Sequence, residues 1–108
     1  GFKAKLEASQ LLKLVNAISP TPAVGGYPQK ESVEWLLKNE LHNRELFTGF
    51  IGPKTNHKLL LLVNLRCAKI TQNQHLYFAG CGVNSGSEVQ KEWLETEAKM
   101  NVIRSYWN

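Results

Sequence analysis

Three charged residues near the C-terminus have the types and the spacing of an ion-binding site. Glu92, Glu95 and Lys99 stand at positions i, i+3 and i+7 of a stretch that contains no proline. An α-helix turns about 100° per residue, so all three share one helix face. Two carboxylates suit a divalent cation such as Mg²⁺, and an ammonium group suits an anionic substrate. The same spacing is equally that of a solvated helix face.

Two loops and one strand could complete such a site. Ala79-Gly80-Cys81-Gly82 precedes the charged helix, and its glycines let a ligand approach the backbone. The segment 20–26 combines two prolines with two glycines, which indicates a stiff loop or a plain interhelix connection. Arg66 stands within a leucine-rich stretch, where its planar guanidinium either binds a carboxylate or points outward to solvent.

The helices and strands that must position these residues are predicted from the hydrophobic pattern and from the residues that start and stop helices. The pattern predicts strands over 2–6, 47–54, 58–70 and 75–80, and helices over 9–18, 28–39 and 87–107. Ser9 and a Ser87-to-Gln90 capping box are the expected helix starts. We expect an α+β fold in which the strands pair antiparallel, strand 58–70 is buried on both faces, and the tryptophans 35, 93 and 107 lie in the core.

Composition narrows the function classes. The chain has 108 residues, 43% of them hydrophobic, and a net charge of +4, which suits one domain or part of one. The lysines and arginines are scattered, so we expect no nucleic-acid partner, and no apolar run is long enough for a membrane span. Cys67 and Cys81 lack a metal-binding spacing. We expect both to be reduced thiols in a cytoplasmic protein.

Four ordered blocks of the chain form a recognisable pattern. They are Pro20-Thr21-Pro22-Ala23-Val24-Gly25-Gly26-Tyr27-Pro28, Arg44-Glu45-Leu46-Phe47-Thr48-Gly49-Phe50-Ile51-Gly52, Leu65-Arg66-Cys67-Ala68-Lys69, and the stretch from Ala79-Gly80-Cys81-Gly82 through Ser87 to Glu92-Trp93-Leu94-Glu95-Thr96 and Lys99. These blocks resemble the chorismate-utilising enzymes, and among these the isochorismate synthases. Any one of them alone is a weak motif, but together they span most of the chain. The chain departs from the pattern at Ser19, where the family has histidine, and at Pro53.

The resemblance implies a fold and a place in it. Residues 1–108 would be the C-terminal portion of a single chorismate-binding domain with the anthranilate synthase-like fold. The family's general-base lysine, general-acid glutamate and first metal-binding glutamate match no segment here, so we expect them upstream. We therefore expect the chain to be a fragment that is inactive alone and that self-associates through exposed core.

The resemblance also implies roles for individual residues. Glu95 would bind Mg²⁺ and Glu92 would hold a metal-bound water. Lys99 would meet the ring carboxylate of chorismate, while Arg66 and the Gly80 backbone would bind its enolpyruvyl carboxylate. The pocket wall would include Ala23, Val24 and Phe47.

Two of these positions favour one branch of the family. Salicylate synthases tend to carry threonine at the position of Ala23 and tyrosine at that of Phe47. At both positions this chain has the residue that isochorismate synthases have. We therefore expect the parent protein to be an Mg²⁺-dependent isochorismate synthase, an isomerase serving menaquinone or siderophore biosynthesis. A salicylate synthase or other chorismate-utilising enzyme, and a non-catalytic half-domain that acts as a binding module, are the alternatives.

Overall fold

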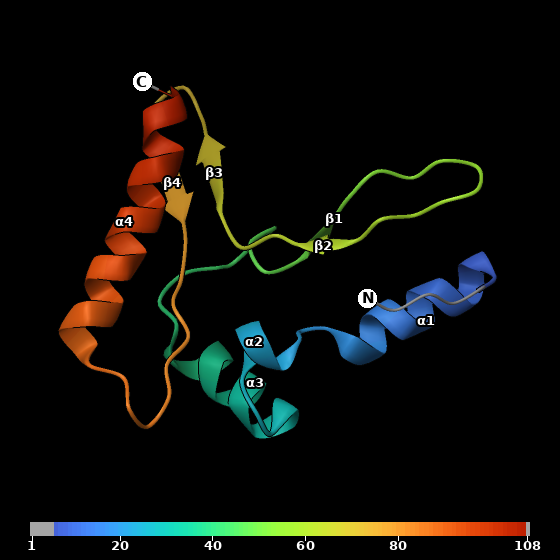
Figure 1. Cartoon of the computed structure of the whole chain (residues 1–108), viewed down its shortest axis with the longest axis horizontal. Helices are drawn as coiled ribbons and strands as arrows, with labels where there is room; N and C mark the ends of the chain where they lie inside the picture. Colours follow the sequence, from blue (N-terminus) through green and yellow to red (C-terminus); the bar gives the residue numbers. More distant parts are fainter. Residues whose placement is uncertain (1–5, 108) are drawn as a thin grey trace. The chain divides into compact units, whose positions relative to one another are not determined.

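The structure, a computed structural model, describes residues 6–107 and divides the chain into two compact units, with the division between Leu41 and His42. Figure 1 shows their elements, which are helical in the first unit and mixed in the second. The predicted strand 2–6 falls almost wholly outside the described residues. The α+β class with antiparallel pairing is confirmed, whereas its placement within the chorismate-binding fold stays a prediction.

The first unit contains α1 (Ala8–Ile18), α2 (Pro22–Gly25) and α3 (Gln29–Asn39). The prediction that Ser9 caps α1 is wrong, since the helix begins at Ala8 and the Glu7 N–H donates to the Gln10 side chain at 3.0 Å. The helix ends before Pro20 as predicted, because proline lacks the N–H that a further turn requires.

The loop of the first unit forms a short helix and a glycine turn. α2 occupies residues 22–25, and Gly26 has φ of 82°, a conformation that favours glycine. Gly25 is buried, with space for no side chain, because an added Cβ would lie 2.7 Å from Pro20 Cγ. Gln29 Nε2 donates to the Pro20 carbonyl at 3.1 Å and joins the two ends of the loop.

The second unit contains two small antiparallel sheets and one long helix. β1 (Phe50–Ile51) pairs with β2 (Leu62–Val63), and β3 (Cys67–Ile70) forms a hairpin with β4 (His75–Phe78). The hairpin turn is the predicted one at 71–74, where Gln74 N donates to the Thr71 hydroxyl at 3.1 Å. The predicted strands 47–54 and 58–70 are therefore too long. Because segment 58–70 pairs with two different strands, it bends between them.

The helix α4 (Val89–Trp107) runs beside the hairpin (Figure 1). Arg104 lies 5.2 Å from the Tyr77 ring centroid, and the rings of His75 and Trp107 meet edge to face at 6.2 Å. The end of α4 agrees with the prediction. The Ser87 capping box is wrong, because the helix begins at Val89 and the Ser87 hydroxyl instead accepts from the Asn84 N–H at 3.0 Å.

Neither unit has a closed core. Among the residues that the structure describes, no hydrophobic side chain is buried, and the predicted core tryptophans are 61%, 58% and 59% exposed at 35, 93 and 107. The expectation that strand 58–70 is buried on both faces is also wrong. A two-stranded sheet beside one helix covers only one face of each element, which leaves the other face in solvent. No helix in residues 6–107 is both long and apolar enough to span a bilayer.

Candidate functional site

Lys99 is the central residue of the site in the second unit. Its Nζ forms an ion pair with Glu95 Oε1 at 2.5 Å and donates a hydrogen bond to the Gly80 carbonyl at 3.0 Å. The side chain is 24% exposed, against 55% for that of Glu95. The ammonium group therefore joins α4 to the loop that follows β4, and three of the predicted site residues lie together.

The two glutamates of α4 are one helix turn apart, as the spacing predicted. Glu92 is half-buried and Glu95 exposed. In the described part of the chain no three His, Cys, Asp or Glu side chains gather at a metal-binding distance. The pair Glu92 and Glu95 would suit Mg²⁺, because this ion is often bound by one or two carboxylates and keeps waters and substrate oxygens in its shell. The metal-ligand roles stay predictions.

The loop after β4 also approaches the turn at 43–49. The ring of Phe47 stacks on that of Phe78, the last residue of β4, with centroids 5.9 Å apart and planes at 30°. Phe47 Cζ lies 3.6 Å from the place that a Cβ on Gly80 would occupy. Phe47 and Gly80, which were predicted on separate motifs, are therefore neighbours, and Gly80 connects Phe47 to Lys99.

Arg66 is placed differently from the prediction. It lies at the bend directly before β3, not in the middle of a strand, and its side chain is exposed. Among residues 6–107 no hydrogen bond or ion pair of its guanidinium group is seen. Because the guanidinium group of Arg66 stays in water, it needs no partner within the chain. Its carboxylate-binding role stays a prediction.

The remaining two predicted residues belong to the first unit. Ala23 and Val24 lie on α2, the former exposed and the latter half-buried. The Val24 N–H and the Gly25 N–H both donate to the Thr21 carbonyl, at 3.0 and 2.8 Å. The backbone of this segment is therefore held locally, by its own turn.

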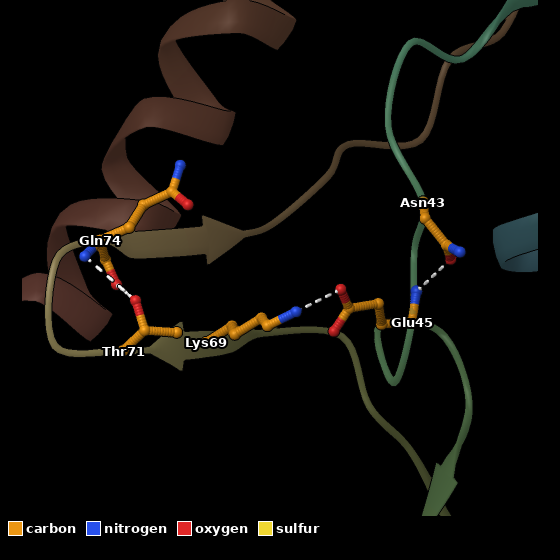
Figure 2. A network of polar contacts seen from close by, with 5 residues as sticks. All are labelled: Asn43, Glu45, Lys69, Thr71 and Gln74. Carbon is orange, nitrogen blue, oxygen red and sulfur yellow. Dashed lines mark hydrogen bonds and ion pairs between the residues drawn. The ribbon is translucent and has the colours of Figure 1, made fainter.

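Sequence reasoning missed a polar network between β3 and the turn that carries Phe47. Lys69 Nζ of β3 forms an ion pair with Glu45 Oε1 at 2.7 Å, and Asn43 Oδ1 accepts from the Glu45 N–H at 2.8 Å (Figure 2). No sequence pattern signals this pair, because its residues are 24 positions apart. The Glu95–Lys99 pair, by contrast, has the i, i+4 order that commonly forms on helices and was available as a signal.

Both cysteines are free, in line with the expected reduced thiols, and both are half-buried. Partial burial raises the pKa of the Cys67 thiol; a hydrogen bond with Asn64 acts in the opposite direction, and the nearby Glu45 carboxylate raises the pKa further. Cys67 is thus a less reactive thiol than a solvated one.

The chain shows clear similarity to known proteins over almost its whole length. The model of the family described as chorismate binding enzyme matches residues 2–107. No solved structure is significantly similar to the chain. The family match extends over both units.

Several relatives are isochorismate synthases. The chain is 35% identical over 107 residues to a salicylate biosynthesis isochorismate synthase of Pseudomonas aeruginosa, covering 95% of this chain and 22% of that protein. It is 33% identical to isochorismate synthase EntC of Escherichia coli, covering 94% and 27%, and 31% identical to MenF of the same species, covering 84% and 21%. The chain spans about a quarter of the length of these curated relatives. The family model and the relatives together show that the chain belongs to the chorismate binding enzymes.

Proposed function

We propose that the polypeptide containing this chain is an Mg²⁺-dependent isochorismate synthase of the cytoplasm, and that this chain supplies substrate-binding and metal-binding groups. Similarity to several isochorismate synthases over nearly the whole chain supports the reaction. The contact that carries the proposal is the Lys99 ammonium, which lies against both Glu95 and Gly80.

The side chains of α4 and its neighbouring loop would bind the two carboxylates of chorismate. Lys99 would bind the ring carboxylate; in support, its Nζ lies at the Gly80 loop and its side chain is only 24% exposed. Arg66 and the Gly80 N–H would bind the enolpyruvyl carboxylate, and Phe47 would form one wall. When bound at Glu92 and Glu95, Mg²⁺ would neutralise substrate charge and so favour binding of the dianion.

In this proposal the acid–base residues come from polypeptide outside this chain. A lysine would deprotonate the water that adds to the ring carbon beside the carboxylate-bearing carbon, and a glutamic acid would protonate the departing 4-hydroxyl. One water is added and one is released, so chorismate is isomerised. The isolated chain is therefore expected to have no turnover.

The test is product chromatography after chorismate and Mg²⁺ are incubated with the full-length polypeptide, with the isolated chain and a Lys99→Met variant in parallel. Isochorismate from the full-length polypeptide alone is the expected result. Turnover by the isolated chain would contradict the division of roles. Salicylate with equimolar pyruvate would assign the protein to the salicylate synthases.

A second proposal concerns the exposed apolar side chains. In the first unit, the side chains of Leu12, Leu37 and Leu41 are 66%, 80% and 101% exposed. In the second unit, those of Val89 and Tyr106 are 87% and 86% exposed. Apolar surface on this scale marks sites of protein contact. We expect it to pack against the rest of the catalytic domain in the full-length polypeptide, and to drive self-association when the chain is alone. If the apolar surface neither packs against the rest of the domain nor drives self-association, the chain is better explained as an independent binding module.

A further inference from the structure

The turn at residues 43–49 has an unusual backbone. Glu45 has φ of 48° and Thr48 has φ of 66°, both in the left-handed region that side chains other than glycine adopt rarely. Residues persist in this region only where their surroundings hold them, and such positions cluster where geometry serves function. The turn therefore needs specific contacts, and the structure shows which ones.

A contact within the turn and two neighbouring segments hold it. The Asn43 side chain accepts from the Glu45 N–H at 2.8 Å, and the Asn64 side chain, beyond β2, donates to the Leu46 carbonyl at 3.0 Å. Lys69 of β3 supplies the ion pair to the Glu45 carboxylate at 2.7 Å (Figure 2). Lys69 is itself fixed opposite Leu76 in the hairpin register. The ion pair is thus a direct polar connection between the turn and the β3–β4 hairpin.

What the turn carries is Phe47, two residues after Glu45. Its ring stacks on Phe78 of β4 and reaches the Gly80 loop. Lys69 and Phe78 lie on the two strands of the same hairpin, so the ion pair and the ring stack fix the turn to that hairpin at two points. Loss of the ion pair would leave the turn held by the Asn43 and Asn64 hydrogen bonds and would leave the ring stack as its contact with the hairpin.

We propose that Glu45 and Lys69 are positioning residues that set the Phe47 ring over the Gly80 loop and thereby tune substrate binding. This rests on the proposed function in one respect, that Phe47 lines the substrate pocket. The two side chains are 42% and 47% exposed, and ion pairs this exposed contribute little to folding stability. Their effect is therefore expected in substrate affinity more than in unfolding.

The experiment uses the full-length polypeptide with chorismate and Mg²⁺. Glu45→Gln and Lys69→Met should each raise KM by about threefold to tenfold while kcat stays within about twofold, since uniform binding is lost. The charge swap that combines Glu45→Lys with Lys69→Glu should restore KM to near its original value. A swap that behaves like the sum of its single variants would overturn the proposal.

Two further variants separate positioning from general stability. Glu45→Gly relieves the positive φ but removes the carboxylate, so it should raise KM as Glu45→Gln does. Glu88→Gln removes another exposed ion pair, in which Glu88, directly before α4, contacts Lys91 of that helix at 2.6 Å, and should leave KM unchanged. Equal KM changes in Glu45→Gln and Glu88→Gln would contradict a specific role for Glu45.

A spectroscopic readout works even if chorismate is not the substrate. With 4-fluorophenylalanine at position 47, the ¹⁹F resonance reports the ring's packing against Phe78. Glu45→Gln and Lys69→Met should shift or broaden it, and the charge swap should return it toward its original position. An unchanged resonance in both single variants would refute the positioning role. A shifted resonance without any chorismate turnover would refute the proposed function alone.

Discussion

The two units carry site residues in different ways. In the second unit, side chains from separate elements contact one another: Lys99 of α4 binds the Gly80 carbonyl, and Phe47 stacks on Phe78 of β4. In the first unit, Ala23 and Val24 lie on a four-residue helix that is held by its own backbone and by the loop around it. The site residues of the second unit are thus fixed by contacts between elements, and those of the first by the local path of the chain.

This difference has a physical source in residue type. Ion pairs and aromatic stacks fix distances between elements that are far apart in sequence, such as Glu45 and Lys69. Proline and glycine fix only the local path of the chain, as at Pro22 and Gly26. Lys99 and Gly80 of the second unit have the first kind of order, and Ala23 and Val24 of the first unit have the second.

The largest expected effect comes from removing the ammonium group of the second unit. Under the proposed function, Lys99→Met should lower kcat/KM for chorismate by about 100-fold or more, because a charge-assisted contact to a substrate carboxylate would be lost. Steady-state kinetics of the full-length polypeptide measures it. Lys91→Met is the matched control on the same helix, since Lys91 pairs with Glu88 but is 73% exposed. Comparable losses in both would show that α4 charge in general, and not preorganisation, matters.

The next effect compares glycines of the two units. A Cβ on Gly52 would lie 1.7 Å from the Leu60 carbonyl oxygen, which is backbone and cannot move without disturbing segment 58–70. Gly52→Ala should therefore destabilise the protein by about 1–3 kcal/mol, as overpacking does. Gly25→Ala, whose nearest neighbour is the Pro20 ring at 2.7 Å, should cost less. Urea unfolding with Gly82→Ala as the control, where no atom lies within 4 Å, decides the order.

How far the sequence predicts this molecule follows the same division between local and distant contacts. The C-terminal ends of α1 and α4 and the 71–74 turn could be predicted, because proline, helix spacing and turn residues act locally. The spacing of Glu95 and Lys99 also placed them together. The bend at Arg66 could not be predicted, since it depends on which strands pair with segment 58–70. The positive φ of Glu45 and its pairing with Lys69 likewise arise only from tertiary contacts.

A smaller effect tests which unit carries the exposed apolar surface. The isolated chain should sediment as concentration-dependent oligomers, because burying apolar side chains is favourable at about 25 cal/mol per Å². Leu37→Lys in the first unit, where the side chain is 80% exposed, should shift the distribution toward monomer. Tyr106→Lys, at 86% exposed, makes the same test in the second unit. Monomeric sedimentation of the unsubstituted chain at all concentrations would show that neither surface drives association.

The smallest effect is the titration of Cys67, which reports the order of the turn in the second unit. Burial raises the pKa of this thiol above its usual value near 9.0, so its alkylation by iodoacetamide should accelerate at a higher pH than that of free cysteine. Because the raised pKa belongs to the folded state, its contribution to stability is complete below the unfolded pKa and is lost as pH rises through the folded one.

Asn64→Ala removes the hydrogen bond that opposes the rise in the pKa of Cys67, and should move the alkylation profile to still higher pH. Glu45→Gln should move it the other way, since a carboxylate that repels the thiolate is removed. A Cys67 profile identical to that of free cysteine would mean that the Glu45–Asn64–Cys67 contacts are not maintained in solution, and with them the order that distinguishes the second unit from the first.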